Sequence, residues 1–162
     1  MKINEGKTKI MLFNASKKYD FLPQISVRDD GCPLELVENY KLLGVHLRSD
    51  LKWSDNTDNI TRTAYERLWM VRRLRQLLAS IHDLLDVYFK QIRRVLETAV
   101  PAWHSLLTKS ERYQIERVQK TALHMILGDG YTSYSDALAL LELKSLDERR
   151  KDMCIKFAKK VF

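Results

Sequence analysis

The sequence predicts an α+β fold that is mainly helical, and three observations support this. The residues before Trp53 form short, β-like apolar runs separated by turn residues. After Trp53, apolar residues recur at helical spacing almost to the last residue. With 162 residues, 45% of them hydrophobic, the chain can bury a core in one domain, or in one domain and part of another.

We therefore divide the chain into three parts. Residues 1–53 are predicted to form a small antiparallel β element, and residues 54–128 an antiparallel helical bundle. Residues 129–162 add C-terminal helices that continue the bundle. No internal repeat, low-complexity segment or flexible linker interrupts this order.

Four short segments of the first part are predicted to be strands. The first is the apolar run Lys9–Phe13, and the second is the alternating segment Pro23–Val27. Arg28–Gly31 ends in Asp-Gly, which tolerates the positive φ of tight hairpins, so we expect Leu34–Val37 to pair back on the second strand. Tyr40–Leu47 is predicted to be the last strand.

Gly44 lies in the middle of this last predicted strand. A glycine there often marks a bulge, or a close approach by another backbone or a ligand. Lys41, His46 and Arg48 alternate with apolar residues such as Leu43, so one side could be buried while the cations face outward. An ordinary terminal strand is the alternative interpretation.

The first helix is predicted to open after Trp53-Ser54-Asp55 and to bury one apolar stripe. Its members are Ile60, Ala64, Leu68, Val71, Leu74 and Leu78. At about 100° per residue, Arg62, Trp69 and Arg73 share the opposite face, with Tyr65 and Arg72 on its flank. Arginines and aromatics together can contact phosphates and stack on sugars or bases. The alternative is a solvated face whose Trp69 packs on another helix.

Three further helices and one short helix follow. One is predicted from Ile81 to Ala99, with Pro101 at or just past its end. A capping box at Thr108–Glu111 opens the next, which stops at Gly128. A short helix begins at Ser133–Asp136, and a second capping box at Ser145–Glu148 opens the last. The inward residues are Ile81, Leu85, Tyr88, Ile92, Val95, Leu96, Ile115, Val118, Ala122, Met125, Ile126, Leu146, Met153, Phe157 and Val161.

Positive charge is concentrated on these predicted helices. The chain has 28 Lys+Arg against 21 Asp+Glu, a net charge of +7. Residues 56–127 carry a net +5 and residues 144–162 a net +4, whereas residues 128–143 carry −3. Such an excess favours an anionic partner, although many soluble proteins are equally basic without one.

The cysteines, an acidic pair and the short apolar runs limit which kinds of protein this chain can be. Cys32 and Cys154 are far apart and have no partner at metal-ligand spacing, which indicates a reducing, intracellular setting, nuclear or cytoplasmic. Asp29 and Asp30 invite a metal-binding interpretation, but their place beside Gly31 favours a turn. We expect no membrane span and no secretory signal.

The sequence carries no convincing catalytic set. It has no Gly-rich phosphate loop, no nucleophile elbow and no metalloprotease His pair, and its carboxylates are scattered over caps and turns. We therefore expect neither a stand-alone enzyme nor a bound cofactor or metal.

The order of the segments nevertheless resembles one family. Asn4–Phe13, NEGKTKIMLF, resembles the Asn-x-x-Lys-Thr-Lys segment, motif D, of reverse transcriptases from non-LTR (LINE-like) retrotransposons. Tyr40–Leu47, with Leu43-Gly44, resembles motif E, the primer grip. Asp50–Trp53 and the Arg/Leu-rich helix after it are similar to the start of the thumb in these enzymes.

The resemblance continues to the end of the bundle. Leu106, Gln119–Ala122 and Gly128 resemble the post-thumb region of the family, an apolar connection followed by a Gln-rich helix that ends in Ile/Leu-Gly. Each motif is only moderately specific, but together they span nearly the whole chain. The chain is then expected to be the end of a palm, a thumb and a post-thumb bundle.

The family copies RNA into DNA with two metal ions, Mg²⁺ in the parent enzymes, held by palm aspartates upstream of motif D. We expect this chain to lack those aspartates and to be inactive by itself. The resemblance places Lys7 or Lys9 near the leaving pyrophosphate, where a lysine could protonate it. The partners it implies are an RNA/DNA template–primer duplex and the remaining palm and fingers of the polymerase.

The resemblance also suggests how the duplex would be held. The strand around Gly44, with Lys41 and Leu43, would approach the primer backbone. The first helix would follow the minor groove with the face described above, namely Arg62, Tyr65, Trp69, Arg72 and Arg73. Two other readings stay open: a helical adaptor whose Trp69 and Trp103 contact another protein, and an inert remnant with an exposed strand edge at Lys9–Phe13.

Overall fold

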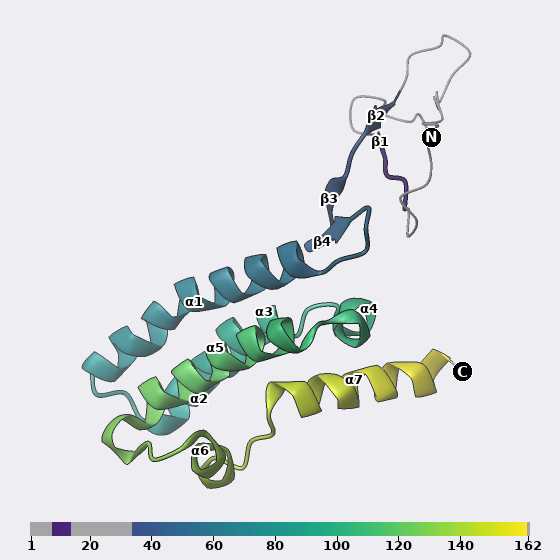
Figure 1. The fold of residues 1–162 in the computed structure, drawn as a ribbon. Coiled ribbons are helices and arrows are strands. Elements are labelled where there is room, and N and C mark those ends of the chain that lie inside the picture. The colour runs from purple at the N-terminus through teal and green to yellow at the C-terminus, as the bar shows by residue number, and fades with distance from the viewer. Residues whose placement is uncertain (1–7, 14–33, 162) are drawn as a thin grey trace. The chain divides into compact units, whose positions relative to one another are not determined.

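We describe a computed structural model of the chain, which places residues 8–13 and 34–161 (Figure 1). It is mainly helical with two small β-sheets, as the sequence predicts. The chain forms two compact units that divide between Asp55 and Asn56. The predicted strand Pro23–Val27, the turn Arg28–Gly31 and Lys7 lie outside the described residues.

The first small sheet is parallel, not antiparallel as expected. Strand β1, Lys9–Ile10, pairs with β2, Glu35–Leu36, with Lys9 opposite Glu35. These two side chains form an ion pair, and the Val37 amide donates to the Ile10 carbonyl at 2.8 Å. A parallel pair needs a long crossover, and more than 20 residues separate the two strands. The run Lys9–Phe13 is thus a strand over its first two residues only.

The expected single strand Tyr40–Leu47 is instead a tight hairpin. Strand β3, Asn39–Leu42, pairs antiparallel with β4, Val45–Arg48. Leu43 and Gly44 make the two-residue turn, with φ of +48° and +87°. Positive φ at both positions is the rule for such hairpin turns, and glycine accepts it without steric cost. Gly44 therefore serves the turn, and a Cβ there would meet nothing within 4 Å.

Arg48 joins the end of this hairpin to the start of the first helix. Its Nε and Nη2 donate to the two oxygens of Asp50 at 3.0 Å each, and its Nη1 donates to Asp55 at 3.1 Å. The hydrogen bonds from Arg48 lower the pKa of Asp50 to about 2. This bidentate pair orders the connection into helix α1.

Helix α1, Ser54–Gln76, has the predicted buried stripe for most of its length. Ile60, Ala64, Leu68 and Val71 are buried. The prediction is wrong at Leu78, which is 92% exposed, because the helix has ended and Leu78 adopts a φ of +59°. A capping turn, in which the Ala79 amide donates to the Leu74 carbonyl, ends the helix before the apolar pattern of the sequence ends at Leu78.

The next helical segment contains a wider π turn that sequence periodicity did not reveal. It runs through α2, Ile81–Val87, the π-helix η2, Tyr88–Arg93, and α3, Arg94–Leu96. The buried residues follow one another at intervals of four: Leu84, Tyr88, Ile92 and Leu96. Four-residue spacing drifts by about 40° per step in an α-helix, and a π turn reduces that drift. Ile81, predicted to be inward, is half exposed because the stripe begins at Leu84.

A short turn of helix follows the break at Ala99, whose φ is +53°. Helix α4, Val100–Trp103, has Pro101 in its first turn, where the missing amide costs nothing, and the 3₁₀ turn η3, His104–Leu106, completes it. Trp103 is fully buried, and its Nε1 donates to the Thr98 carbonyl at 2.9 Å. Contact of Trp103 with another protein is therefore ruled out in this structure.

Helix α5, Lys109–Leu127, opens with the predicted capping box, in which Thr108 and Glu111 bond each other's backbone amides. Ile115, Val118, Ala122 and Ile126 are buried as predicted. Met125 is only partly buried, and Gln119 and Leu123 take places in the core instead. The 3₁₀ turn η4, Gly128–Gly130, ends the helix.

The last two helices also begin where their caps predict. Ser133 caps α6, Tyr134–Leu140, and Ser145 with Glu148 forms the box before α7, Leu146–Val161. Leu146 is fully buried. Phe157 and Val161 were expected on the same buried face, but both are exposed, because the buried residues of α7, Leu146 and Arg150, lie in its first half.

Within the second unit, α1 and α5 run side by side in the same direction (Figure 1). Gln114 Nε2 on α5 donates to Asp58 on α1 at 2.8 Å, near the start of both helices. Arg75 Nη1 donates to the Met125 carbonyl at 3.0 Å, near their ends. None of the described helices is long and apolar enough to cross a membrane.

Gly128→Ala is expected to destabilise the second unit by about 1–3 kcal/mol. Gly128 has φ +57° and ψ −123°, and a Cβ there would lie 1.9 Å from Nη2 of Arg75, which would have to leave the Met125 carbonyl. Urea denaturation measures the change. Gly130→Ala is the matched control, because a Cβ at Gly130 meets nothing within 4 Å. Equal losses from both substitutions would contradict this account.

Candidate nucleic-acid interface

The outer face of α1 carries the predicted mixture of arginine and aromatic side chains. Arg62, Trp69 and Arg73 are exposed, and Trp69 shows 63% of its surface. Tyr65 and Arg72 on the flank are exposed as well. These five residues are exposed because the helical repeat places them on the side of α1 away from its buried apolar stripe. The alternative in which Trp69 packs on another helix is wrong in this structure.

Within the described part of the chain, none of the arginines of this face pairs with an acidic side chain. Arg62 Nη2 donates to the Asn59 amide oxygen, and Arg73 Nη1 donates to Gln76 Oε1, both at 3.3 Å. Among the described residues, Arg72 forms no side-chain hydrogen bond or ion pair. Neutral partners leave the positive charge of a guanidinium uncompensated, so these groups can bind phosphate.

Two acidic residues reduce the positive charge of this face. Glu66 is exposed, and at about 100° per residue it lies some 40° from Arg62, on the side of Arg73. The sequence interpretation left it out, although its spacing of four from Arg62 was visible. Asp58, four residues before Arg62, is also exposed and falls between Tyr65 and Trp69 around the helix; it accepts from Gln114 Nε2 on α5. The face therefore carries three cations and two acids.

The other predicted residues belong to the first unit. Lys41 lies on β3, and Leu43 at the hairpin turn is 93% exposed. Gly44 is exposed beside it. Lys9 is partly buried and ion-paired with Glu35, so its ammonium has an acidic partner. The hairpin thus presents an apolar tip and one exposed lysine.

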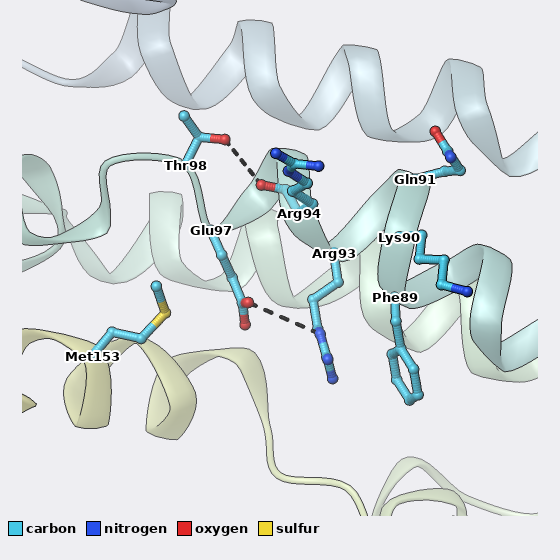
Figure 2. A pocket seen from close by; sticks show the side chains of 8 residues that line it. All are labelled: Phe89, Lys90, Gln91, Arg93, Arg94, Glu97, Thr98 and Met153. Carbon is cyan, nitrogen blue, oxygen red and sulfur yellow. Dashed lines mark hydrogen bonds and ion pairs between the residues drawn. The ribbon is translucent and has the colours of Figure 1, made fainter.

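A groove that the sequence did not predict lies beside the π turn (Figure 2). Its volume is about 800 Å³, and it is lined by Phe89, Lys90, Gln91, Arg93, Arg94, Glu97, Thr98 and Met153. The guanidinium of Arg93 lies 4.0 Å from the centre of the Phe89 ring. Arg93 also reaches Glu97 at 3.9 Å. Partial burial, with the nearby charge of Arg149, lowers the pKa of Arg93.

Most charges of this groove are compensated by pairing. Glu97 accepts from Arg149 Nε at 2.7 Å and from Arg149 Nη2 at 3.2 Å, and Lys90 pairs with Asp86. Arg94 is exposed and keeps its charge free. The Lys90–Asp86 pair lies at the surface, whereas Glu97 is partly buried and links the end of α3 to α7.

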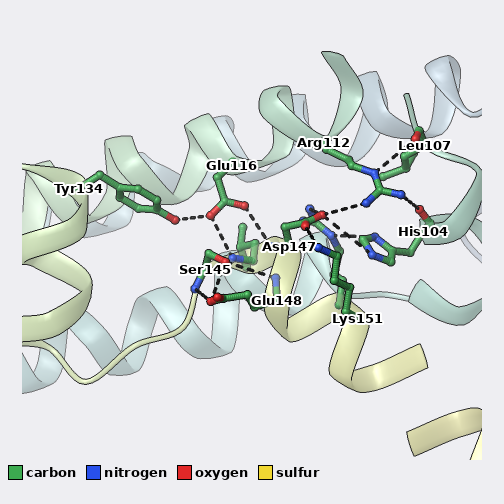
Figure 3. Close-up of polar contacts among 11 residues, drawn as sticks. His104, Leu107, Arg112, Glu116, Tyr134, Ser145, Asp147, Glu148 and Lys151 are labelled. Carbon is green, nitrogen blue, oxygen red and sulfur yellow. Dashed lines mark hydrogen bonds and ion pairs between the residues drawn. The ribbon is translucent and has the colours of Figure 1, made fainter. Parts of the chain in front are cut away.

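A polar network holds the C-terminal helices in place (Figure 3). The Glu116 carboxylate on α5 accepts from the Tyr134 hydroxyl on α6 and from the amides of Leu146 and Asp147, each at 3.1 Å, at the start of α7. A carboxylate there satisfies free amides and complements the helix dipole. Burial and the bond to Glu116 raise the pKa of Tyr134. Glu116 is therefore a structural group, not a free acid.

Asp147 is the second centre of this network. Its carboxylate lies 3.4 Å from Arg112, 3.8 Å from Arg150 and 2.7 Å from Lys151. Partial burial alone would raise the pKa of Asp147, but Lys151 and the two arginines outweigh it and lower that pKa. The carboxylate stays charged and gathers cations from α5 and α7.

Arg150 is fully buried, although the sequence analysis did not count it among the inward residues of the last helix. Its Nε donates to His104 Nδ1 at 3.3 Å. Burial is the largest influence on Arg150 and lowers its pKa, against the attraction of Glu116 and Asp147. One signal did exist: Arg150 follows the buried Leu146 by four residues and so shares its face.

The groups of this network connect α5, α6 and α7 to one another. Within residues 8–13 and 34–161, no three His, Cys, Asp or Glu side chains are close enough together to hold a metal ion. Glu116 binds the first amides of α7, and Asp147 and Glu97 pair with cations. The outer face of α1, by contrast, keeps exposed cations and aromatic rings that a partner could contact.

Glu116→Ala is expected to lower the unfolding free energy by about 1–3 kcal/mol, because three donors lose their acceptor. Tyr134→Phe removes only one of those bonds, so its loss should be near 1 kcal/mol. Chemical denaturation compares the two. If Glu116→Ala were no worse than Tyr134→Phe, the carboxylate would not be fixing α7.

Stability is expected to fall as the pH drops below about 6.5, the ordinary pKa of histidine. Burial, then the charges of Arg150 and Arg112, lower the pKa of His104, and its Nδ1 must stay unprotonated to accept from Arg150. Below this pH, His104 binds a proton in the unfolded chain but stays neutral in the folded chain, so protonation favours the unfolded state. Thermal melts between pH 7.5 and 5 measure this, and His104→Asn should flatten the dependence. An equal slope in that variant would rule His104 out.

Comparison with known proteins identifies no relative of this chain. No family model, no curated protein and no solved structure matches it. The resemblance to non-LTR reverse transcriptases therefore remains a proposal.

Proposed function

We propose that the chain is the palm end, thumb and post-thumb part of a non-LTR retrotransposon reverse transcriptase, and that it holds an RNA/DNA template–primer duplex. Two things support this. The segments resembling motif D, motif E and the thumb occur in the family's order. The helix in the thumb position exposes Arg62, Trp69 and Arg73 on one face, and this is the observation on which the proposal depends.

The chemistry of the face suits a hybrid duplex. An A-like hybrid has a wide, shallow minor groove that displays sugars and is flanked by phosphates. Guanidinium groups bind phosphate oxygens, and an exposed indole packs on sugar rings. Base edges are not needed for such contacts, so binding is expected to tolerate changes of sequence and to weaken with salt.

The proposal assigns duplex handling to this chain and no chemical step. In the parent family Mg²⁺ supports nucleotidyl transfer, and the described residues offer no group that fits such an ion. Lys9, a lysine of the motif D resemblance, is ion-paired with Glu35. The hairpin tip at Leu43 and Gly44, with Lys41, is the proposed contact to the primer strand.

A protein-interaction module is the second candidate function, and one observation favours it. Ile155, Phe157 and Val161 are large apolar side chains exposed on the second half of α7. Isolated apolar residues on a surface are common, but Phe157 and Val161 are four residues apart and so lie on the same side of α7, where they can form a contact patch. Loss of a partner on mutating these residues would support this second function.

Arg62→Glu/Arg73→Glu is expected to weaken binding of a labelled RNA/DNA hybrid at least tenfold at 50 mM salt, because two phosphate contacts become repulsive. Fluorescence anisotropy at 50 and 200 mM salt measures affinity and its salt dependence. Lys156→Glu/Lys159→Glu on α7 is the matched control, since it changes the net charge equally on another helix. Equal weakening in both variants would indicate a general charge effect and would remove α1 from the interface.

A further inference from the structure

Helix α5 exposes a second stripe of cations and aromatic rings that the sequence interpretation did not assign. Its members are Lys109, Tyr113, Arg117, Lys120 and His124. At about 100° per residue they fall within about 80° of the helix circumference. Lys120 is partly buried and the other four are exposed. Unlike the outer face of α1, this stripe contains no acidic residue.

The charges of the stripe are available. Among the residues that the structure describes, neither Lys109 nor Arg117 has an ion-pair partner. Glu116, the neighbouring acid on the helix, is turned to α6 and α7, where it binds Tyr134 and two backbone amides. The nearest carboxylate on α5 therefore does not pair with the cations of the stripe, which keeps its positive charge.

The aromatic part of the stripe is ordered in advance. The ammonium of Lys120 lies 5.3 Å from the ring centre of Tyr113 and 5.1 Å from that of Tyr134, so it stands between the two rings. Tyr113 nevertheless leaves 59% of its surface exposed. His124 meets the ring of Tyr131 edge-on, with 5.0 Å between centres. A ring that is both held and exposed can stack on a flat ligand at little entropic cost.

The stripe adjoins the outer face of α1. The bond from Gln114 Nε2 to Asp58, at 2.8 Å, crosses between two solvent-accessible helix edges. Near the ends of the same two helices, Arg75 on α1 donates to the Met125 carbonyl on α5. Around α5, Gln114 lies about 60° from Arg117, and around α1, Asp58 lies between Tyr65 and Trp69. The bond between them therefore connects the edge of the stripe to the outer face of α1.

We propose that the α5 stripe binds a single strand of nucleic acid. Lys109, Arg117 and Lys120 would meet its phosphates, and Tyr113 would stack on an unpaired base. A base can reach an isolated tyrosine ring in this way only when it is not paired, which favours a single strand over a duplex. The inference rests on the proposed function in one respect: the strand would be an unpaired continuation of the duplex on α1.

The length of the stripe fits such a ligand. From Lys109 to His124 the helix rises by about 22 Å at 1.5 Å per residue. This suits the shortest single-strand sites, which hold about 4 nucleotides. An acidic peptide would satisfy the cations but would gain nothing from Tyr113, so the role of the ring separates the two ligands.

The test uses the full chain with two probes, a fluorescent 12-nucleotide poly(U) RNA and a blunt RNA/DNA hybrid. Lys109→Ala/Arg117→Ala should weaken poly(U) binding at least tenfold and reduce the slope of log K against log salt by about 1.4, at about 0.7 for each lost contact. Lys156→Ala/Lys159→Ala, with the same loss of charge, should change the poly(U) affinity less than twofold.

The tyrosine provides the second arm. Tyr113→Ala should weaken poly(U) binding about fivefold or more, while Tyr113→Phe, which keeps the ring, should bind as the unaltered chain does. Arg62→Ala/Arg73→Ala should weaken the hybrid and leave poly(U) unaffected. Thermal melts establish that each variant is folded.

The outcomes separate this inference from the proposed function. Hybrid binding without poly(U) binding by the folded chain would overturn the inference and leave the proposed function standing. Poly(U) binding without hybrid binding would do the reverse. The inference would also be overturned if neither Lys109→Ala/Arg117→Ala nor Tyr113→Ala changed the poly(U) affinity. Competition by poly-glutamate as strong as that by unlabelled poly(U) would assign the stripe to an acidic peptide.

Discussion

The carboxylate of Glu116 is the interaction on which the second half of the structure depends. It joins α5 to the hydroxyl of Tyr134 on α6 and to the first amides of α7. The first amides of any helix lack intrahelical partners, so an acid at that position both satisfies them and complements the dipole. Three helices that are separated along the chain therefore meet at one side chain.

The position of α7 has consequences further inside the unit. With its start held, α7 directs Arg150 into the core against His104 and sends Arg149 to the partly buried Glu97. These polar groups bond to one another between the helices, and the bonds fix how the helices pack. The outer arcs of α1 and α5 make few such bonds, and their arginines and tyrosines remain available to a ligand.

Local signals in the sequence proved dependable where the interaction itself is local. The capping boxes at Thr108 and Ser145 start their helices where predicted, because cap and amide lie within three residues of each other. The exposed face of α1 is also as predicted, since the helical repeat decides which residues share a side. Tyr40–Leu47 was misread because its turn begins with leucine, a residue that seldom adopts positive φ.

By itself, the sequence determined the mainly helical class, the helix starts and the faces of α1, because these follow from spacing and caps. Only the tertiary structure decided that Arg150 is buried, that Phe157 and Val161 are exposed and that β1 pairs parallel with β2. Each of these depends on a contact between segments more than 20 residues apart, or on where a neighbouring helix ends. Periodicity shows which residues share a face, but the packing of other elements decides how much of that face is covered.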